Sequence, residues 1–171
     1  HHSAHSGFTH LTKEDGLIND FVSGILEDRH NNLWFSTSDG VSKLDKNYLQ
    51  NSVGRKTNSS NQSGNNNNPT RFKNFDYSDG FHGIASRQNA ICEDRNGTIW
   101  IGVTRVGLCS YDGKAFRCYN EKDGPGIRVI FNALEDTEGQ LWFGTGEGVY
   151  RLVGGAFANW TKEDALDPRP R

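Results

Sequence analysis

The chain lacks several features that would assign it to whole classes of protein. It has no methionine, only four prolines and only three cysteines in 171 residues. No run of about 18 apolar residues exists, as a membrane-spanning helix would need, and no signal peptide is recognisable. The 19 basic and 21 acidic residues give a net charge of −2, which argues against a nucleic-acid surface. We therefore expect no membrane segment in this chain and no nucleic-acid partner.

The chain contains one phrase three times. Each copy begins with Glu-Asp and ends with Trp and an apolar residue, and the copies are Glu27–Phe35, Glu93–Ile101 and Glu135–Phe143. The tryptophans of the last two copies lie 42 residues apart, and those of the first two lie 66 apart. A period of about forty residues indicates a repeat architecture.

A second phrase occurs four times. It begins with a Phe, has an aromatic residue or a Leu three residues later, and has an Asp seven residues after the Phe. Its first residues are Phe8, Phe72, Phe116 and Phe157, and its aspartates are Asp15, Asp79, Asp123 and Asp164. The extra 24 residues of the longer interval lie in Asn47–Thr70, which is rich in Asn, Ser and Gly. Such a stretch lacks the apolar residues that offset ordering entropy. We interpret it as a disordered surface loop inside one repeat.

The third repeat indicates the local structure most clearly. Apolar runs at residues 129–134, 140–145, 149–152 and 156–160 are separated by glycine-containing turns, which is typical of short strands. Four such strands in about 42 residues predict one blade of a β-propeller. A helical solenoid is excluded because no window carries a helical apolar stripe. The predicted fold is all-β, with about three blades of four antiparallel strands and an extra outer strand at the N-terminus.

The expected domain boundaries follow from the repeats. Residues 1–7, with His1, His2 and His5, are interpreted as a tag or disordered N-terminus, and residues 8–171 as one three-blade unit. The blades are expected at about 17–76, 81–120 and 125–161, with the Asn-rich insertion 47–70 inside the first.

The repeated aspartates and tryptophans are interpreted as structural. Each Asp precedes a turn, where its carboxylate can accept backbone N–H groups, and each Trp is a large packing anchor. A Glu-Asp pair present in every blade is not expected to be catalytic, because catalysis usually needs one asymmetric site. These residues are Asp28, Asp94, Asp136, Trp34, Trp100 and Trp142.

The combined pattern, Glu-Asp-x-x-Gly-x-Leu-Trp-Phe-Gly-Thr followed by Gly-Val and Asp-Gly-x-x-Phe, resembles the two-component regulator propeller repeat. The best matches are Glu135–Tyr150 and Glu93–Phe116. The first copy departs with Asn32 and Ser36 at glycine positions, and Asn tolerates the left-handed conformation. The resemblance implies an extracytoplasmic (periplasmic) sensor of a bacterial hybrid two-component system that detects a ligand, often a sugar fragment.

Three blades are fewer than the roughly four to eight of a closed propeller. The chain is therefore either a piece of a longer propeller or a protomer that self-assembles, with a dimer giving six blades and a trimer nine. We favour self-assembly, with the spare N-terminal strand crossing the junction between protomers.

Residues that differ between blades are the candidates for ligand binding. The loops between blades and those between the second and third strands should share one rim. The non-repeating polar residues there are His82, Arg87, Arg105, Arg128 and Glu147. Such groups suit a small polar, anionic or glycan ligand, although a solvated rim without a site explains them as well.

The cysteines match no metal-ligand spacing, and no phosphate loop or nucleophile elbow is present, so neither metal nor cofactor is expected. Cys92 replaces a leucine of the other copies and should be a small core residue. Cys109 and Cys118 would face each other if the hairpin turned on Gly113-Lys114. A turn on Asp112-Gly113 is better for type I′, so we predict free thiols.

Three functions remain open. The leading hypothesis is a non-catalytic propeller module for recognition of a ligand or partner. The second is an enzyme, such as a propeller lyase or glycan hydrolase, for which His82 with Glu147 is the candidate pair. The third is a structural, self-assembling repeat protein without a ligand.

Overall fold

The computed structural model describes six segments of the chain, and all structural statements below concern them. They are residues 10–46, 72–82, 84–85, 90–104, 106–119 and 129–160. The Asn-rich insertion, the predicted N-terminal Phe8 and the aspartates Asp123 and Asp164 lie outside these residues. The described His10 and Leu11 are not part of a strand.

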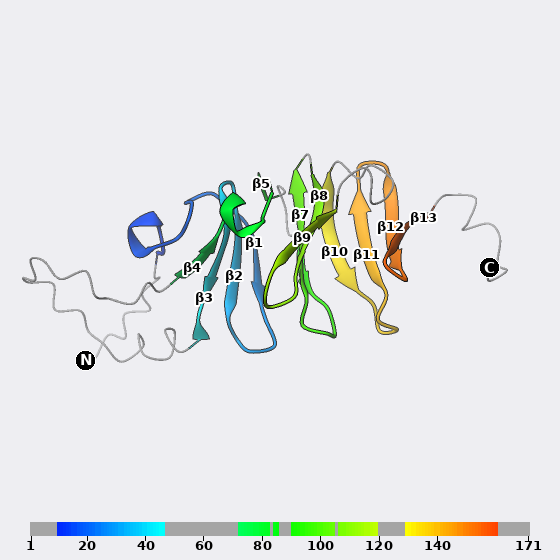
Figure 1. Ribbon diagram of the computed structural model, residues 1–171, viewed down its shortest axis with the longest axis horizontal. Coiled ribbons are helices and arrows are strands. Elements are labelled where there is room, and N and C mark those ends of the chain that lie inside the picture. The colour runs from blue at the N-terminus through cyan, green and yellow to red at the C-terminus, as the bar shows by residue number, and fades with distance from the viewer. Residues whose placement is uncertain are drawn as a thin grey trace, which may run out of the picture.

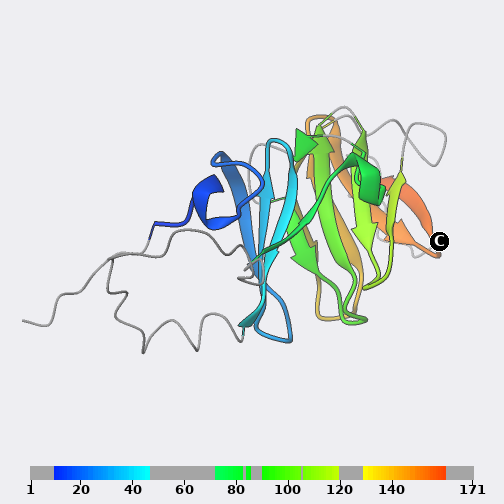
Figure 2. The ribbon, with the colours of Figure 1, turned by 60° about the vertical axis from the view of Figure 1, so that its left-hand side comes forward.

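The described residues form three antiparallel sheets, which we call blades 1, 2 and 3. Blade 1 has the order β1-β2-β3-β4 and blade 3 the order β10-β11-β12-β13. In blade 2, β5 and β6 both pair with β7, which is followed by β8 and β9. The blades lie side by side in chain order (Figure 1), and Figure 2 shows the same order after a 60° turn. The predicted all-β fold of about three blades is confirmed.

The strands are short and joined by tight turns. Blade 1 contains β1 (Val22–Glu27), β2 (Leu33–Thr37), β3 (Gly40–Leu44) and β4 (Phe72–Phe75); blade 2 contains β5 (Ile84–Ala85), β6 (Ile91–Glu93), β7 (Ile99–Thr104), β8 (Gly107–Tyr111) and β9 (Phe116–Tyr119); blade 3 contains β10 (Ile130–Glu135), β11 (Leu141–Thr145), β12 (Gly148–Val153) and β13 (Ala156–Trp160). β3 and β4 pair directly, with Leu44 opposite Phe72. The residues on both sides of the insertion therefore belong to one sheet.

The inner strand of blade 2 departs from the predicted pattern. Blades 1 and 3 have one inner strand with a register shift near its start, between Val22 and Gly24 and between Ile130 and Asn132. In blade 2 the strand divides, with Ala85 opposite Val103 and Ile91 opposite Ile101. Extra residues are thus accommodated at the point where the other two blades already have a bulge.

Two short 3₁₀ turns precede the inner strands of blades 1 and 2: η1 (Lys13–Asp15) and η2 (Tyr77–Asp79). In η2 the carboxylate of Asp79 accepts the N–H of Asp76 at 3.0 Å, and that of Asp76 accepts the N–H of Ser78 at 2.7 Å. Asp15 closes the equivalent capping box in η1. The Asp of the second phrase therefore has a structural role, which the sequence analysis had left unassigned.

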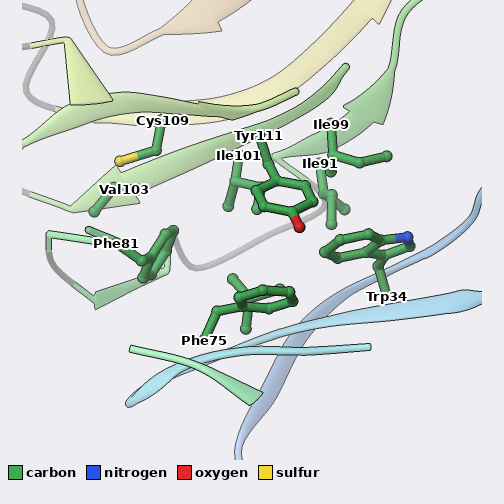
Figure 3. Close-up of a cluster of buried hydrophobic side chains, with 10 residues drawn as sticks. Trp34, Phe75, Phe81, Ile91, Ile99, Ile101, Val103, Cys109 and Tyr111 are labelled. Carbon is green, nitrogen blue, oxygen red and sulfur yellow. The ribbon is translucent and has the colours of Figure 1, made fainter. Parts of the chain in front are cut away.

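The hydrophobic core lies between the blades. Strand side chains alternate between two faces, so in β7 Ile99 and Ile101 pack toward Trp34 of blade 1, whereas Trp100 packs toward Phe143 of blade 3. Figure 3 shows the first of these clusters, with Trp34 and Phe75 opposite Ile101 and Tyr111. Phe81, which follows η2, is only 1% exposed within this cluster. Each blade is thus stabilised mainly by its neighbours.

Candidate functional site

The repeated Asp and Trp form the same hydrogen-bonded turn in all three blades. In blade 1, Oδ1 of Asp28 accepts the N–H groups of His30 at 2.9 Å and of Asn32 at 2.8 Å. Its Oδ2 accepts the indole N–H of Trp34 at 2.8 Å. The predicted backbone bonds are present. The bond from the indole was not predicted, and it joins the turn to the packing anchor.

The other two blades repeat this arrangement closely. The indole N–H of Trp100 donates to Asp94 at 2.9 Å, and that of Trp142 donates to Asp136 at 2.6 Å. Both carboxylates also accept two backbone N–H groups of their own turns. All three aspartates are therefore held by structural hydrogen bonds.

These bonds also affect the ionisation of the carboxylates. Burial raises the pKa of Asp28, but the hydrogen bonds from Trp34 and Asn32 outweigh burial and leave the pKa below its ordinary value. The bond from Trp142, followed by that from the N–H of Gln140, lowers the pKa of Asp136. Since both groups are ionised at neutral pH, neither is suited to donate a proton as a general acid.

The first turn corrects one detail of the sequence analysis. The residue in the left-handed conformation is Asn31, with φ 63°, and not Asn32. Asn31 lies three residues after Asp28, as Gly97 and Gly139 lie three residues after their own aspartates. Asn32 instead donates its side-chain amide to both carboxylate oxygens of Asp28, at 3.1 and 2.9 Å. The assignment of Asn32 to the glycine position was therefore wrong by one residue.

Neighbouring blades are also joined by an arginine–glutamate pair. Arg29 donates its Nε–H to Oε1 of Glu93 at 2.6 Å and its backbone N–H to Oε2 at 2.7 Å. Arg95 makes the same two bonds to Glu135, at 2.8 and 2.7 Å. We call this arrangement the Arg–Glu clamp. The clamp was not predicted, although an Arg directly follows Glu-Asp in two of the three copies.

Each clamping guanidinium also lies over the turn of the next blade. Arg29 donates to the backbone carbonyls of Asp94 and of Arg95, the latter at 2.9 Å. A Cβ at Gly97 would lie 3.6 Å from the guanidinium of Arg29, and one at Gly139 would overlap that of Arg95. The glycines therefore provide positive φ and also leave space for the arginine of the preceding blade.

The predicted rim residues are only partly described. Arg87, Arg105 and Arg128 lie outside the described residues. His82 is exposed, and its ring packs edge-on against Tyr77 with centroids 4.4 Å apart. Glu147 is exposed in the turn between β11 and β12, where its N–H donates to Oγ1 of Thr145 at 3.1 Å.

No hydrogen bond or ion pair joins His82 to Glu147 in the part of the chain that the structure describes. The turns that connect β2 to β3, β7 to β8 and β11 to β12 lie along one edge of the blades, opposite the Asp turns (Figure 1). These turns therefore lie at one edge of the fold, and the predicted rim and its role in ligand binding stay predictions.

The prediction of free thiols at Cys109 and Cys118 was wrong, because the two form a disulfide. The loop between β8 and β9 has four residues, 112–115, since Tyr111 pairs with Phe116. The carboxylate of Asp112 stabilises this loop by accepting the N–H groups of Lys114 and Ala115, at 2.8 and 2.9 Å. The hairpin is therefore centred on Gly113-Lys114, and this register places the two cysteines directly opposite each other.

Cys92 is a free thiol and packs against the core between blades 2 and 3. Burial, followed by the charges of Asp94 and Glu135, raises its pKa to about 12. Within the described ranges, no three His, Cys, Asp or Glu side chains are placed to hold a metal ion. Nor do these ranges contain a helix with the length and apolar character needed to cross a bilayer.

Comparisons with known proteins support the fold. The structure is similar to the extracellular domain of BT3049 from B. thetaiotaomicron, described as a hybrid two component system, with a TM-score of 0.64 and 17% identity over 92% of this chain and 19% of that one. It is similar to the extracellular domain of BT4673 from the same organism, described as a one component system, with a TM-score of 0.61 and 19% identity over 89% of this chain and 20% of that one.

A third similar structure is an inactive variant of virginiamycin B lyase from Staphylococcus aureus with quinupristin. Its TM-score is 0.53 and its identity 15%, over 82% of this chain and 41% of that chain. A search of curated proteins gives no match. The chain spans about a fifth of the length of the first two structures.

The sequence itself also matches a family model. Residues 16–39 and 86–105 match the model described as Two component regulator propeller. The first segment contains β1, the turn of Asp28 and β2, and the second contains β6, the turn of Asp94 and β7. The resemblance seen in the sequence is confirmed over these two segments, which are similar to the two-component regulator propeller repeat.

Proposed function

We propose that this chain is a non-catalytic recognition module of an extracytoplasmic sensor. The observation that carries the proposal is the family match at residues 16–39 and 86–105. The similar structures described as extracellular domains of regulatory systems support the same location. So does the Cys109–Cys118 disulfide, because such bonds persist in oxidising compartments. Because the chain spans about a fifth of those structures, transfer of a signal to a kinase would belong to other segments.

A catalytic role has less support. The lyase named above supports the fold alone at 15% identity. Asp28, Asp94 and Asp136 are held by the indole and backbone N–H groups of their own turns. His82 is exposed beside Tyr77, without a carboxylate partner among the described residues. An enzyme needs one asymmetric set of groups in mutual contact, and recognition requires no such set.

We place the ligand on the rim that carries His82, Arg87, Arg105, Arg128 and Glu147. On the rim as predicted, three guanidinium groups, an imidazole and a carboxylate would donate to and accept from the hydroxyl and carboxylate groups of a glycan fragment. Arginine in particular binds carboxylates through two parallel hydrogen bonds. The ligand class that this rim fits is therefore a small polar or acidic glycan.

Ring closure is part of the same proposal. Three blades need further blades to complete a propeller of the usual size, and we propose that one or two more copies of the chain supply them. The rim loops of all copies would then surround one central channel.

A thermal-shift screen tests the recognition function. Neutral and acidic oligosaccharides are added to the protein, and a ligand of the folded state should raise Tm by mass action. An Arg105→Ala, Arg128→Ala double variant should lose that rise. Lys114→Ala is the matched control, because Lys114 lies in the loop between β8 and β9 at the opposite edge. No rise with any glycan, or an equal loss in the control, would contradict the proposal.

A further inference from the structure

The junction between two blades of this chain has an apolar part. We call the side of a blade that faces the next blade its leading face: Trp34, Val41 and Phe75 in blade 1. The opposite side is the trailing face: Ile91, Ile99 and Ile101 in blade 2. These six side chains belong to one buried cluster. The same alternation joins blade 2 to blade 3.

The equivalent residues at the two ends of the chain are uncovered. Val149 pairs with Trp160 as Val41 pairs with Phe75, so these pairs occupy the same place in blades 3 and 1. Val41 and Phe75 are 0% and 3% exposed, whereas Val149 and Trp160 are 40% and 43% exposed. The leading face of blade 3 thus exposes the groups that a following blade buries elsewhere.

The trailing face of blade 1 shows the complementary difference. Ile25 lies opposite Phe35 as Ile91 lies opposite Ile101. Ile91 is 7% exposed beneath blade 1, and Ile25 is 60% exposed. Phe35, the counterpart of Ile101, is only 8% exposed because it lies in a cluster with Leu17 and Leu44. One end of the chain therefore offers an uncovered leading face, and the other end a trailing face that is uncovered around Ile25.

The polar parts of these two end faces also match each other. At the clamp position blade 3 has Thr137, which lacks the guanidinium of Arg29 and Arg95. At the position over which the guanidinium passes, blade 1 has Asn31 in place of the glycine. The amide of Asn31 donates to Oε1 of Glu27 at 3.1 Å, so the carboxylate that an incoming Arg would use is already bonded. Blade 3 thus lacks the arginine donor, and blade 1 lacks the glycine that would leave space for it.

Arg151 supplies a further observation on the leading face of blade 3. Arg151 lies opposite Trp142, as Lys43 lies opposite Trp34. Its guanidinium lies 5.5 Å from the rings of both Trp142 and Trp160. Its Nε is buried and has no hydrogen-bond partner within the described residues.

We propose that the leading face of blade 3 binds the trailing face of blade 1 of a second copy of this chain. A blade of another protein with Arg at the clamp position would collide with the Asn31 side chain and would find Glu27 already hydrogen-bonded. Thr137 of a second copy needs neither the space that Asn31 fills nor the carboxylate of Glu27. The contact joins different faces of the two protomers, so it is heterologous, and repetition closes it into a ring of two or three copies. This inference rests on the propeller module proposed above.

Light scattering on a sizing column tests the junction directly. The monomer mass is 19.1 kDa, and wild-type protein should elute as a discrete dimer or trimer. Val149→Glu breaks only the leading face and Ile25→Glu only the trailing face, so each variant alone should be monomeric. Tyr77→Glu is the control, because Tyr77 is 73% exposed on η2, outside both faces, and it should assemble normally.

Mixing the two variants gives the decisive result. The intact leading face of Ile25→Glu can bind the intact trailing face of Val149→Glu, so the mixture should form a dimer of one copy of each. Only folded variants can restore this mass, which excludes loss of folding as the cause of the monomers. An assembly of the combined Thr137→Arg, Asn31→Gly variant should contain the missing clamp and should dissociate more slowly than the wild-type assembly.

A wild-type monomer at every concentration, or an assembly that survives either single variant, would overturn the inference. A mixture that remains monomeric although both variants are folded would do the same. A monomer whose Tm still rises with a glycan would remove the junction and leave the recognition function standing. An assembled ring that responds to no glycan would support the junction and contradict the recognition function.

Discussion

Arg29 binds Glu93 of the following blade through two separate groups, its Nε–H at 2.6 Å and its backbone N–H at 2.7 Å. The carboxylate therefore connects two blades at both the side-chain and the main-chain level. The Arg29 side chain is 40% exposed and that of Glu93 only 12%. This asymmetry means that the two partners should not contribute equally to stability.

Removal of the glutamate should cost more than removal of the arginine. In Arg29→Ala the backbone N–H still donates to Glu93, so we expect a loss of about 1 kcal/mol in the free energy of unfolding. In Glu93→Ala both donors lose their acceptor, and we expect about 2 kcal/mol. Urea unfolding measures both values, and equal losses would contradict the two-group clamp.

Gly139 should be less replaceable than Gly113, although both have positive φ, 84° and 93°. A Cβ at Gly113 meets no atom within 4 Å, whereas one at Gly139 overlaps the guanidinium of Arg95. We expect Gly113→Ala to cost about 1 kcal/mol from backbone strain alone, and Gly139→Ala to cost about 1 kcal/mol more. In an Arg95→Ala background the difference should disappear, and its persistence would show another cause.

Asp28→Ala should be strongly destabilising. It removes the acceptor of the buried Trp34 indole and of two backbone N–H groups, so we expect about 3 kcal/mol. Asp112→Ala is the control, because Asp112 also accepts two backbone N–H groups but in an exposed loop. Its cost should be below about 1 kcal/mol, and similar losses would show that the indole bond contributes little.

Stability should fall in acid because of the Asp turns. The pKa values of Asp28 and Asp136 in the folded protein lie below the ordinary 3.8, so the unfolded chain binds these protons more tightly. Their contribution is complete above about pH 5 and is lost as the pH falls through the lowered pKa values. Urea unfolding at several pH values checks this, and Asp28→Asn should show a shallower slope below pH 5. An unchanged slope would exclude Asp28 as a source of the loss of stability in acid.

Reduction of the Cys109–Cys118 disulfide should lower the free energy of unfolding by about 2.5 kcal/mol, the value expected for a short loop.

Cys92 should not react with alkylating reagents in the folded protein, because burial raises its pKa to about 12. Mass spectrometry after alkylation should find no modified cysteine in the native protein and one in the unfolded, unreduced protein. Two or three reactive thiols without reductant would contradict the pairing.

The sequence was most informative where a feature repeats along the chain. The strand Ala156–Trp160 lies where the alternation of turns and apolar residues predicts it, and the Asp turns accept the expected backbone N–H groups. The strands and turns of each repeat are formed by residues close to one another in sequence, so their local patterns predict them directly.

Contacts between residues far apart in sequence were missed. Arg29 and Glu93 are 64 positions apart, and nothing in a single repeat shows that they meet. The disulfide depended on whether the hairpin is centred on Asp112-Gly113 or on Gly113-Lys114, which the Asp112-Gly113 dipeptide alone does not decide.

The Arg–Glu clamp has a consequence for how such a chain can grow. Each Glu-Asp-Arg copy carries an acceptor for the blade before it and a donor for the blade after it. Tandem duplication of one gene segment would therefore create a working contact at once, without a second compensating mutation. A copy that has lost the donor, as at Thr137, ends this series, so a single codon change can set the number of blades that are clamped together.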